Sequence, residues 1–268
     1  MRSTIQLISS VTVILLIFSG FGYAQELPAI ENDAFQRGEK VKYRVFYDAW
    51  LTSGLTAGTG TITVNHSTKQ FHGRNTYYMS IEARSVGLFN FFFKVRDKFE
   101  SWIDEEALVP WQFKRDIYEG GYEKKEDVLF DRFNNTATST NKTMEVPPMV
   151  QDIVSSFYYM RTLDYSDALP GDEYFIDFIL DDSVYNSKII FLGREIVETR
   201  LGKFRCLKFK PMVAQGEVFD EPYPMTLWVT DDRNLVPVLG SSAVIIGSIK
   251  LELIEAEGLR HPMEAKID

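Results

Sequence analysis

The sequence predicts a mainly β protein, built as a curved antiparallel sheet or half-open β-barrel with one packed α-helix. Short segments of alternating apolar and polar residues recur along the chain, with Gly- or Asp-rich turns between them. Such spacing without intervening helices is typical of antiparallel pairing. The 268 residues also include 20 Phe and 13 Tyr, which are enriched in strands. A single helical pattern interrupts the alternation.

The alternation places most of the strands directly. In the first half it predicts strands at 41–47, 61–64, 77–84, 98–104, 111–118, 125–133 and 135–140. Gly54, Gly58 and Gly60 predict a turn before the second strand, and residues 119–122 (Glu-Gly-Gly-Tyr) predict a hairpin. In the second half the predicted strands are 174–180, 185–192, 195–199, 204–210, 226–230, 236–239 and 243–255.

The predicted helix covers about residues 149–163. Apolar residues recur three and four places apart at Val150, Ile153, Val154 and Phe157. The preceding prolines at 147 and 148 suit a helix start, because a missing N–H at the first turn leaves no bond unmade. We expect the helix to pack against the concave side of the sheet through Ile153, Val154 and Phe157.

The N-terminus has the organisation of a secretory signal peptide. A positive start at Arg2 precedes an apolar run at 11–18 and small residues at Gly22 and Ala24. We expect cleavage after about Ala24 and a periplasmic location. The alternative is an uncleaved anchor, but the apolar run is short for a hydrocarbon core of roughly 30 Å. The expected organisation is a signal peptide at 1–24, a flexible lead-in at 25–38, a single β-rich domain at 39–258 and a tail at 259–268.

The charge balance limits the classes of partner. The chain has 29 Lys and Arg against 38 Asp and Glu, a net charge of −9. Nucleic acid is not expected as a partner, because phosphate neutralisation needs clustered basic residues. The same balance disfavours a general attraction to an anionic membrane surface. No stable membrane span is expected after cleavage, because no long apolar run follows the signal peptide.

No familiar catalytic or metal-binding pattern emerges. Cys206 is the only cysteine and lies in an alternating segment, which favours an unreactive strand thiol over a nucleophile. The histidines at 66, 72 and 261 lack ligand spacing, so no metal and no cofactor are expected. The acidic pairs at 181–182 and 231–232 fit turns, where Asp bonds its own backbone. A glycosidase would need two carboxylates across a cleft, which sequence alone does not place.

The segment 86–95 is the candidate ligand-binding element. It gathers apolar side chains that follow neither the strand nor the helix period. One interpretation is a central strand buried on both faces, and the other is an apolar flap over a ligand cavity. Under the second interpretation the ligand-binding residues are Leu88, Phe89, Phe91, Phe92 and Phe93.

Six segments follow one another in a recognisable order: Gly38–Tyr43, Asp97–Asp104, Tyr118–Tyr122, Gln151–Arg161, Gly193–Glu195 and Leu227–Asp232. Together they resemble an exported bacterial family known as Domain of Unknown Function 3108. The resemblance covers about residues 35–258. It implies a bacterial envelope protein, and it supplies no catalytic or ligand residue. The architecture is also loosely similar to the half-barrels that carry lipoproteins between membranes, an analogy that does not determine function.

Three functions remain open at this point. The leading expectation is a non-enzymatic protein that binds an apolar ligand, either a lipid or a lipoprotein-like group, or an envelope protein partner. The alternative is a hydrolase that acts on envelope glycans or lipids through unidentified carboxylates. A third is a scaffold whose sheet edge pairs with another protein.

Overall fold

The computed structural model describes residues 27–48, 54–212, 224–243 and 248–267, so the predicted signal peptide lies outside it. Within these ranges one antiparallel sheet has the strand order β8-β7-β6-β5-β4-β3-β2-β1-β14-β13-β12-β11-β10-β9. The first half contributes β1 (Lys40–Asp48), β2 (Leu55–His66), β3 (Thr76–Ser85), β4 (Arg96–Asp104), β5 (Pro110–Glu119), β6 (Tyr122–Asp131), β7 (Thr136–Thr138) and β8 (Thr143–Glu145). The second half contributes β9 (Glu173–Leu180), β10 (Ser183–Thr199), β11 (Gly202–Pro211), β12 (Met225–Thr230), β13 (Pro237–Ala243) and β14 (Ser248–Glu257).

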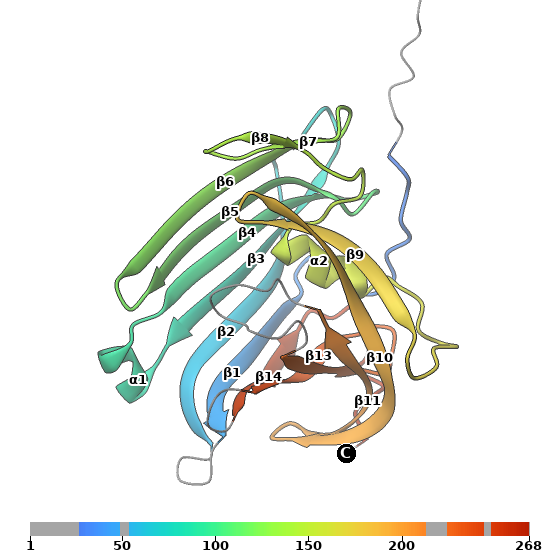
Figure 1. Cartoon of the computed structure of the whole chain (residues 1–268). Helices are drawn as coiled ribbons and strands as arrows, with labels where there is room; N and C mark the ends of the chain where they lie inside the picture. Colours follow the sequence, from blue (N-terminus) through green and yellow to red (C-terminus); the bar gives the residue numbers. More distant parts are fainter. Residues whose placement is uncertain (1–26, 49–53, 213–223, 244–247, 268) are drawn as a thin grey trace, which may run out of the picture.

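The predicted fold class is confirmed, since the sheet curves strongly and does not close (Figure 1). β8 and β9 end the strand order and are not paired with each other. β1 joins the two halves of the chain, because Lys40 pairs with Thr63 of β2 on one side and with Glu257 of β14 on the other. The first and last strands of the sequence are therefore neighbours in the middle of one continuous sheet.

The packed helix, α2 (Ile153–Met160), is shorter than the predicted 149–163. It begins only after Asp152, whose carboxylate accepts a hydrogen bond from Ser155 N at 2.7 Å, while Ser155 Oγ accepts one from Asp152 N at 2.8 Å. This reciprocal cap fixes the helix start. The residue before it, Gln151, bonds instead to the edge of β9, where its N–H donates to Asp177 O at 2.8 Å. The prolines at 147 and 148 therefore do not lie at the start of the helix.

α2 lies inside the curve of the sheet, between β3 and β4 on one side and β9 on the other (Figure 1). Val154 is completely buried against the main core, and Phe157 packs beside it at partial exposure. Ile153, the third expected contact residue, is half-buried. The helix fills much of the hollow that a curved sheet would otherwise leave open.

The segment 86–95 differs from its predicted conformation. It contains a short helix, α1 (Gly87–Phe92), that connects β3 to β4 and has no buried residue. The interpretation as a central buried strand is therefore wrong. The physical reason is the position of α1. It connects the ends of β3 and β4 beyond the sheet, where none of the described strands covers it (Figure 1).

Glycines explain two further differences from the predicted strands. β10 continues through the expected break at Gly193, which has φ of 130° where the register with β11 shifts. This is a β-bulge, and it lets one long strand bend. Gly58, expected in a turn, lies within β2, where an added Cβ would come 2.9 Å from Arg84 O. The close approach of β2 and β3 thus requires glycine there.

A group of polar contacts, named here the clasp, connects the two ends of the open sheet. The β9–β10 turn supplies Asp181, which forms ion pairs with Arg115 of β5 and Lys124 of β6. The next residue, Asp182, accepts a hydrogen bond at 2.8 Å from Nδ2 of Asn141 in the β7–β8 turn. The halves of the sheet therefore meet through side chains where their strands do not pair.

The segments on either side of the β domain both pack against it, although the lead-in at 25–38 was expected to be flexible. Phe35 has no exposed surface and stacks edge-on against Tyr158 of α2, with ring centroids 4.8 Å apart. At the other end, Ala265 is fully buried and its carbonyl accepts a hydrogen bond from Arg205 N at 2.8 Å. Both segments thus extend the core beyond the sheet itself.

Candidate functional site

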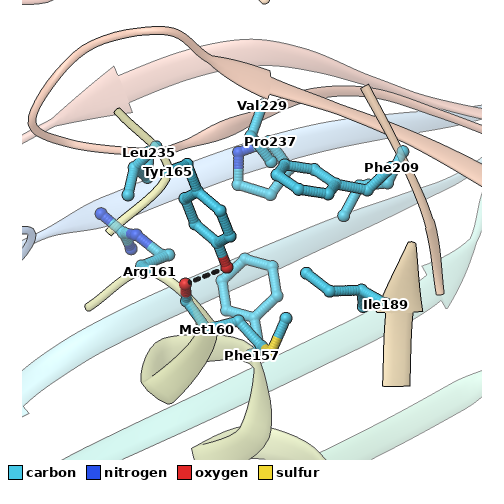
Figure 2. A pocket seen from close by; sticks show the side chains of 10 residues that line it. Phe157, Met160, Arg161, Tyr165, Ile189, Phe209, Val229, Leu235 and Pro237 are labelled. Carbon is cyan, nitrogen blue, oxygen red and sulfur yellow. Dashed lines mark hydrogen bonds between the residues drawn. The ribbon is translucent and has the colours of Figure 1, made fainter. Parts of the chain in front are cut away.

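An apolar pocket of about 70 Å³ lies between α2 and the strands of the second half (Figure 2). Its walls come from α2, the following loop, β10, β11, β12 and the start of β13. The lining residues are Phe157, Met160, Arg161, Tyr165, Ile189, Phe209, Leu227, Val229, Leu235 and Pro237. Aliphatic and aromatic side chains therefore dominate the lining, as is usual for small-molecule sites.

Tyr165 forms a rigid part of this lining. Its hydroxyl donates a hydrogen bond to Met160 O at 2.7 Å (Figure 2), and its ring centroid lies 4.9 Å from that of Phe209. Burial raises the pKa of Tyr165, so the hydroxyl stays protonated. The loop after α2 is thus attached both to the helix end and to β11, and the pocket is pre-formed on this side.

Arg161, at the C-terminal end of α2, is the one charged residue among the described residues of the lining. Its Nη1 and Nη2 donate to the two carboxylate oxygens of Glu39 at 2.5 and 2.9 Å, and both residues are buried. Nε donates to Asn234 O at 2.9 Å. Burial opposes the charge on Arg161, but Glu39 outweighs this effect and raises the pKa of the guanidinium. The buried charge is therefore fully paired, which favours an electrically neutral pocket wall.

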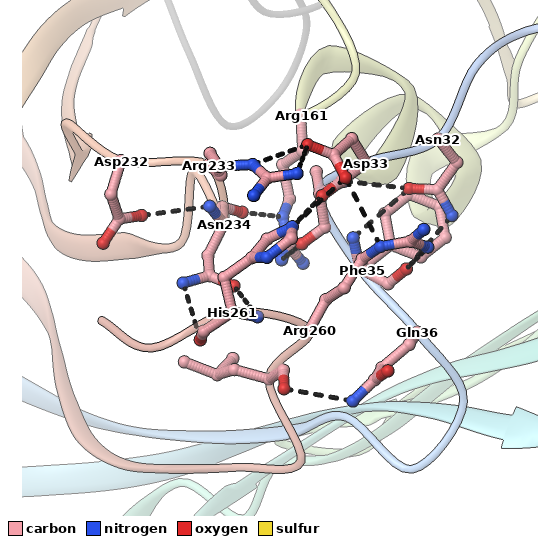
Figure 3. A network of polar contacts seen from close by, with 12 residues as sticks. Asn32, Asp33, Phe35, Gln36, Arg161, Asp232, Arg233, Asn234, Arg260 and His261 are labelled. Carbon is pink, nitrogen blue, oxygen red and sulfur yellow. Dashed lines mark hydrogen bonds and ion pairs between the residues drawn. The ribbon is translucent and has the colours of Figure 1, made fainter. Parts of the chain in front are cut away.

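A polar network continues from Arg161 and joins three distant segments (Figure 3). Asn234 Nδ2 donates to the carbonyls of His261 and Pro262 at 3.1 and 3.2 Å. His261 Nε2 lies 2.7 Å from Asp33 O, and Arg233 Nε donates to the Asp33 carboxylate at 2.8 Å. The hydrogen bond from Arg233 is the main cause that lowers the pKa of Asp33. The lead-in, the β12–β13 turn and the tail thereby hold one wall of the pocket in place.

Sequence reasoning missed both the pocket and this network. Glu39 and Arg161 lie 122 positions apart, and neither forms a recognisable motif with its neighbours. The only signal was that both lie within segments that carry the family resemblance. Asp231 and Asp232 were expected only as turn residues. That role is confirmed for Asp232, which accepts a hydrogen bond from Asn234 N at 3.0 Å.

The five predicted ligand-binding residues are not part of the pocket. Their side chains are exposed on α1 and the residue after it, at the far end of β3 and β4; they are Leu88, Phe89, Phe91, Phe92 and Phe93. The structure brings them together as a surface cluster and does not place them against the pocket lining.

The remaining candidates for chemistry lie apart from the pocket. Burial raises the pKa of Cys206 to about 12, so its thiol is protonated at neutral pH and is a poor nucleophile. His66 and His72 are exposed around the β2–β3 loop. The described part of the chain holds no group of three or more His, Cys, Asp or Glu that suits a metal ion. It also contains no helix that is long and apolar enough to cross a membrane.

Comparison with solved structures supports the fold. A β-barrel-like protein of the family DUF1849 from Brucella abortus aligns with a TM-score of 0.53 at 12% identity, over 86% of this chain and 99% of that chain. A candidate exported protein from Bacteroides fragilis and a candidate lipoprotein from Parabacteroides distasonis align at 11% identity each. They cover 85% and 86% of this chain and 99% of their own, but their TM-scores of 0.35 and 0.36 are too low to support a shared fold.

No curated protein matches the sequence significantly. The model of the family described as "Protein of unknown function (DUF3108)" matches residues 42–254, which run in chain order from β1 to β14. This match confirms the resemblance that the sequence motifs indicate. Because it extends over most of the chain, the protein belongs to the DUF3108 family.

Proposed function

We propose that this chain is an exported, periplasmic envelope protein that binds the apolar end of a ligand in the pocket between α2 and the second half of the sheet. The observation that carries the proposal is the described part of the lining, in which the single charge, on Arg161, is neutralised by Glu39. A group that brings no charge of its own meets only apolar surface there, and its transfer from water is favourable. Export and the periplasmic location rest on the signal-peptide pattern at residues 1–24.

The size of the pocket limits the ligand. A volume of about 70 Å³ exceeds the ~30 Å³ share of one water molecule but is below the ~150 Å³ cavity that accommodates benzene. In this conformation the pocket takes the terminal part of an acyl chain or a short aliphatic group, and the rest of the ligand stays outside.

The test combines ligand detection with a pocket-filling variant. Native mass spectrometry of the protein purified from its own envelope should detect a co-purifying lipid. Leu227 is a half-buried lining residue on β12, and Leu227→Trp should occupy the pocket with an indole ring. We expect this variant to lose the lipid and to lose the fluorescence enhancement of N-decyl dansylamide, a dye whose free alkyl end fits a pocket of this size while the dansyl group stays outside.

The matched control is Leu129→Trp, the same substitution at a half-exposed position on β6 that does not line the pocket. It should keep both the lipid and the dye response, and urea denaturation should show that both variants remain folded. Equal binding by the wild type and the folded Leu227→Trp variant would contradict a role for this pocket. Absence of lipid and dye binding in the wild type would contradict the proposed function.

A further inference from the structure

The tip of the β3–β4 connection exposes an unusual amount of apolar surface. Leu88, Phe91 and Phe92 are 74, 82 and 76% exposed, and Phe93 follows at 54%. Scattered exposed apolar residues are normal in soluble proteins, but a contiguous cluster marks an interaction site. This cluster is contiguous in sequence, and the rings of Phe91 and Phe92 lie 5.3 Å apart in an edge-to-face arrangement. We call these four side chains the aromatic tip.

The aromatic tip is held in a defined conformation by the backbone and side chains beneath it. Asn90 Oδ1 accepts hydrogen bonds from Ser85 Oγ at 3.1 Å and from Arg96 Nη2 at 2.8 Å. Val86 N donates to Ala57 O of β2 at 2.9 Å. On the other side, the ring of Phe93 lies so close to Gly120 that a Cβ there would come within 2.2 Å of it. The exposure of the rings therefore belongs to a fixed local structure.

The aromatic tip stands at the end of the sheet where two other pairs of neighbouring strands also end. Tyr47 near the end of β1 pairs with Leu55 at the start of β2, and Glu119 pairs with Tyr122 at the β5–β6 turn. Because the strands are antiparallel, these strand ends and α1 share one end of the sheet (Figure 1). Leu55 and Tyr122 are 56 and 57% exposed. The apolar surface is thus extended by flanking residues at the same end.

The charged side chains of the segment 84–96 are all positive, whereas the whole molecule has a negative net charge. Arg84, Lys94 and Arg96 are all exposed, and no acidic residue occurs between positions 84 and 96. Asp97, which follows, is buried and accepts a hydrogen bond from Tyr118 N at 3.1 Å. Exposed acidic residues lie outside this segment, at Glu82 of β3 and at Glu119 and Glu123 beside the β5–β6 turn, where Glu119 pairs with Val95. A local cluster of three cations therefore lies behind the aromatic tip of a chain with a net charge of −9.

We propose that the aromatic tip inserts into the surface of an anionic phospholipid bilayer. The apolar rings would enter the boundary between headgroups and acyl chains, while Arg84, Lys94 and Arg96 contact lipid phosphates. The apolar faces of interfacial helices are buried about 5–10 Å into this boundary, and exposed Phe and Leu side chains supply such a face on α1. This proposal goes beyond ligand binding in the pocket and does not depend on it.

The shape of the tip favours a fluid lipid surface over a protein as its occupant. α1 projects from the end of the sheet (Figure 1), and its side chains Leu88, Phe91 and Phe92 are mostly exposed. A folded partner would need a matching cavity to contact all of them, whereas lipids rearrange around each ring. The cations lie directly behind the rings in sequence, at the level where phosphate groups begin. Charge complementarity therefore selects an anionic bilayer.

The experiment is co-sedimentation of the purified protein with vesicles of phosphatidylcholine alone and of phosphatidylcholine mixed with phosphatidylglycerol. We expect binding to the mixed vesicles, weaker binding to the neutral ones, and a decrease with added salt because salt screens the cations. In Phe91→Ser/Phe92→Ser the partition coefficient should fall by about tenfold for each ring removed. Lys94→Gln/Arg84→Gln should remove the preference for the anionic vesicles and keep residual binding.

The matched control is Phe175→Ser, which removes a ring that is 71% exposed on β9, away from α1. It should bind vesicles as the wild type does. All variants should unfold at the urea concentration of the wild type, because the removed side chains are exposed. Equal partition of the wild type and Phe91→Ser/Phe92→Ser would overturn the proposal. The proposal would also be overturned if the wild-type protein bound neither kind of vesicle and instead formed a dimer that Phe91→Ser/Phe92→Ser abolishes.

The two proposals fail separately. The Phe91→Ser/Phe92→Ser variant should retain dye binding in the pocket, because these rings do not line it. Leu227→Trp should retain vesicle binding, because Leu227 lies on β12 and not at the aromatic tip. Each variant should therefore lose one activity and keep the other. This pattern distinguishes membrane binding by α1 from ligand binding in the pocket.

Discussion

Asp152 shows how one buried side chain serves two elements at once. Its carboxylate caps α2 through Ser155 and also accepts a hydrogen bond from Ser101 Oγ of β4 at 2.6 Å. The group is completely buried, and this burial raises the pKa of Asp152 to about 6 although the hydrogen bonds oppose the shift. The helix is thereby attached to the sheet by a carboxylate that the interior favours in its protonated form.

A dependence of stability on pH follows from this pKa. Between the ordinary value of 3.8 and about 6, the folded state holds a proton that the unfolded state releases. The free energy of unfolding should therefore decrease as the pH rises through this window, by about 3 kcal/mol at most from this group. Asp152→Asn keeps a capping side chain and removes the titration. Urea denaturation at several pH values should show a smaller decrease for this variant, and an identical slope would contradict the assignment.

At the scale of elements, the junction between β14 and β1 depends on a glycine. Gly258 follows the end of β14 with φ of 64°, and an added Cβ would come 2.2 Å from Gly38 O at the start of β1. The three nearest atoms, Gly38 O, Gly38 C and Glu39 N, all belong to backbone, so none can rotate away as a side chain would. The lead-in and the tail therefore reach their packed positions only because this crossing has no side chain.

Gly258→Ala should consequently destabilise the fold by about 2–3 kcal/mol, which combines backbone strain with the collision. The control is Gly121→Ala in the β5–β6 turn, where φ is 100° and nothing lies within 4 Å of an added Cβ. That variant carries strain alone and should lose about 1 kcal/mol. Thermal and urea denaturation of both proteins measure the difference. Equal losses would show that the chain around Gly38 relaxes freely.

At the scale of the whole molecule, the clasp is one connection between the β9 end of the sheet and the preceding part of the chain, and the backbone hydrogen bonds of Gln151 to β9 are another. Partial burial raises the pKa of Asp181, but the hydrogen bonds from Lys124 and Arg115 outweigh it and lower the pKa below the ordinary 3.8. The contribution of the clasp to stability is therefore present above pH 3.8 and is lost as the pH falls through the lowered pKa. Opening at this point separates the edges without unfolding the middle of the sheet.

Asp181→Asn should accordingly accelerate amide hydrogen exchange in β9 and the β9–β10 turn, with little change in exchange around β1 and β14. Added salt should act in the same direction, because it screens the exposed ion pair with Lys124. Asp116→Asn is the control, since Asp116 pairs with Lys125 at 2.7 Å on adjacent strands of one half. Exchange rates that respond equally to both substitutions would mean that the clasp does not restrain the edges.

The alternation of residue types and the turn residues by themselves determined most of the strands. The Glu119–Tyr122 hairpin and the Asp181–Asp182 turn were both predictable and both occur. The reason is that the period of two and the preference of Gly and Asp for turns act between neighbours in the chain. Membership of the DUF3108 family was likewise readable from local segments.

The tertiary structure alone decided which distant residues meet. Alternation tells which side chains share a face but not what covers that face, so the pairing of Glu39 with Arg161 and the pocket beside it were not predictable. For the same reason the apolar segment 86–95 was expected in the core or over a cavity, whereas it projects from the end of the sheet. Its hydrophobicity is a local property, but its exposure depends on where the other strands end.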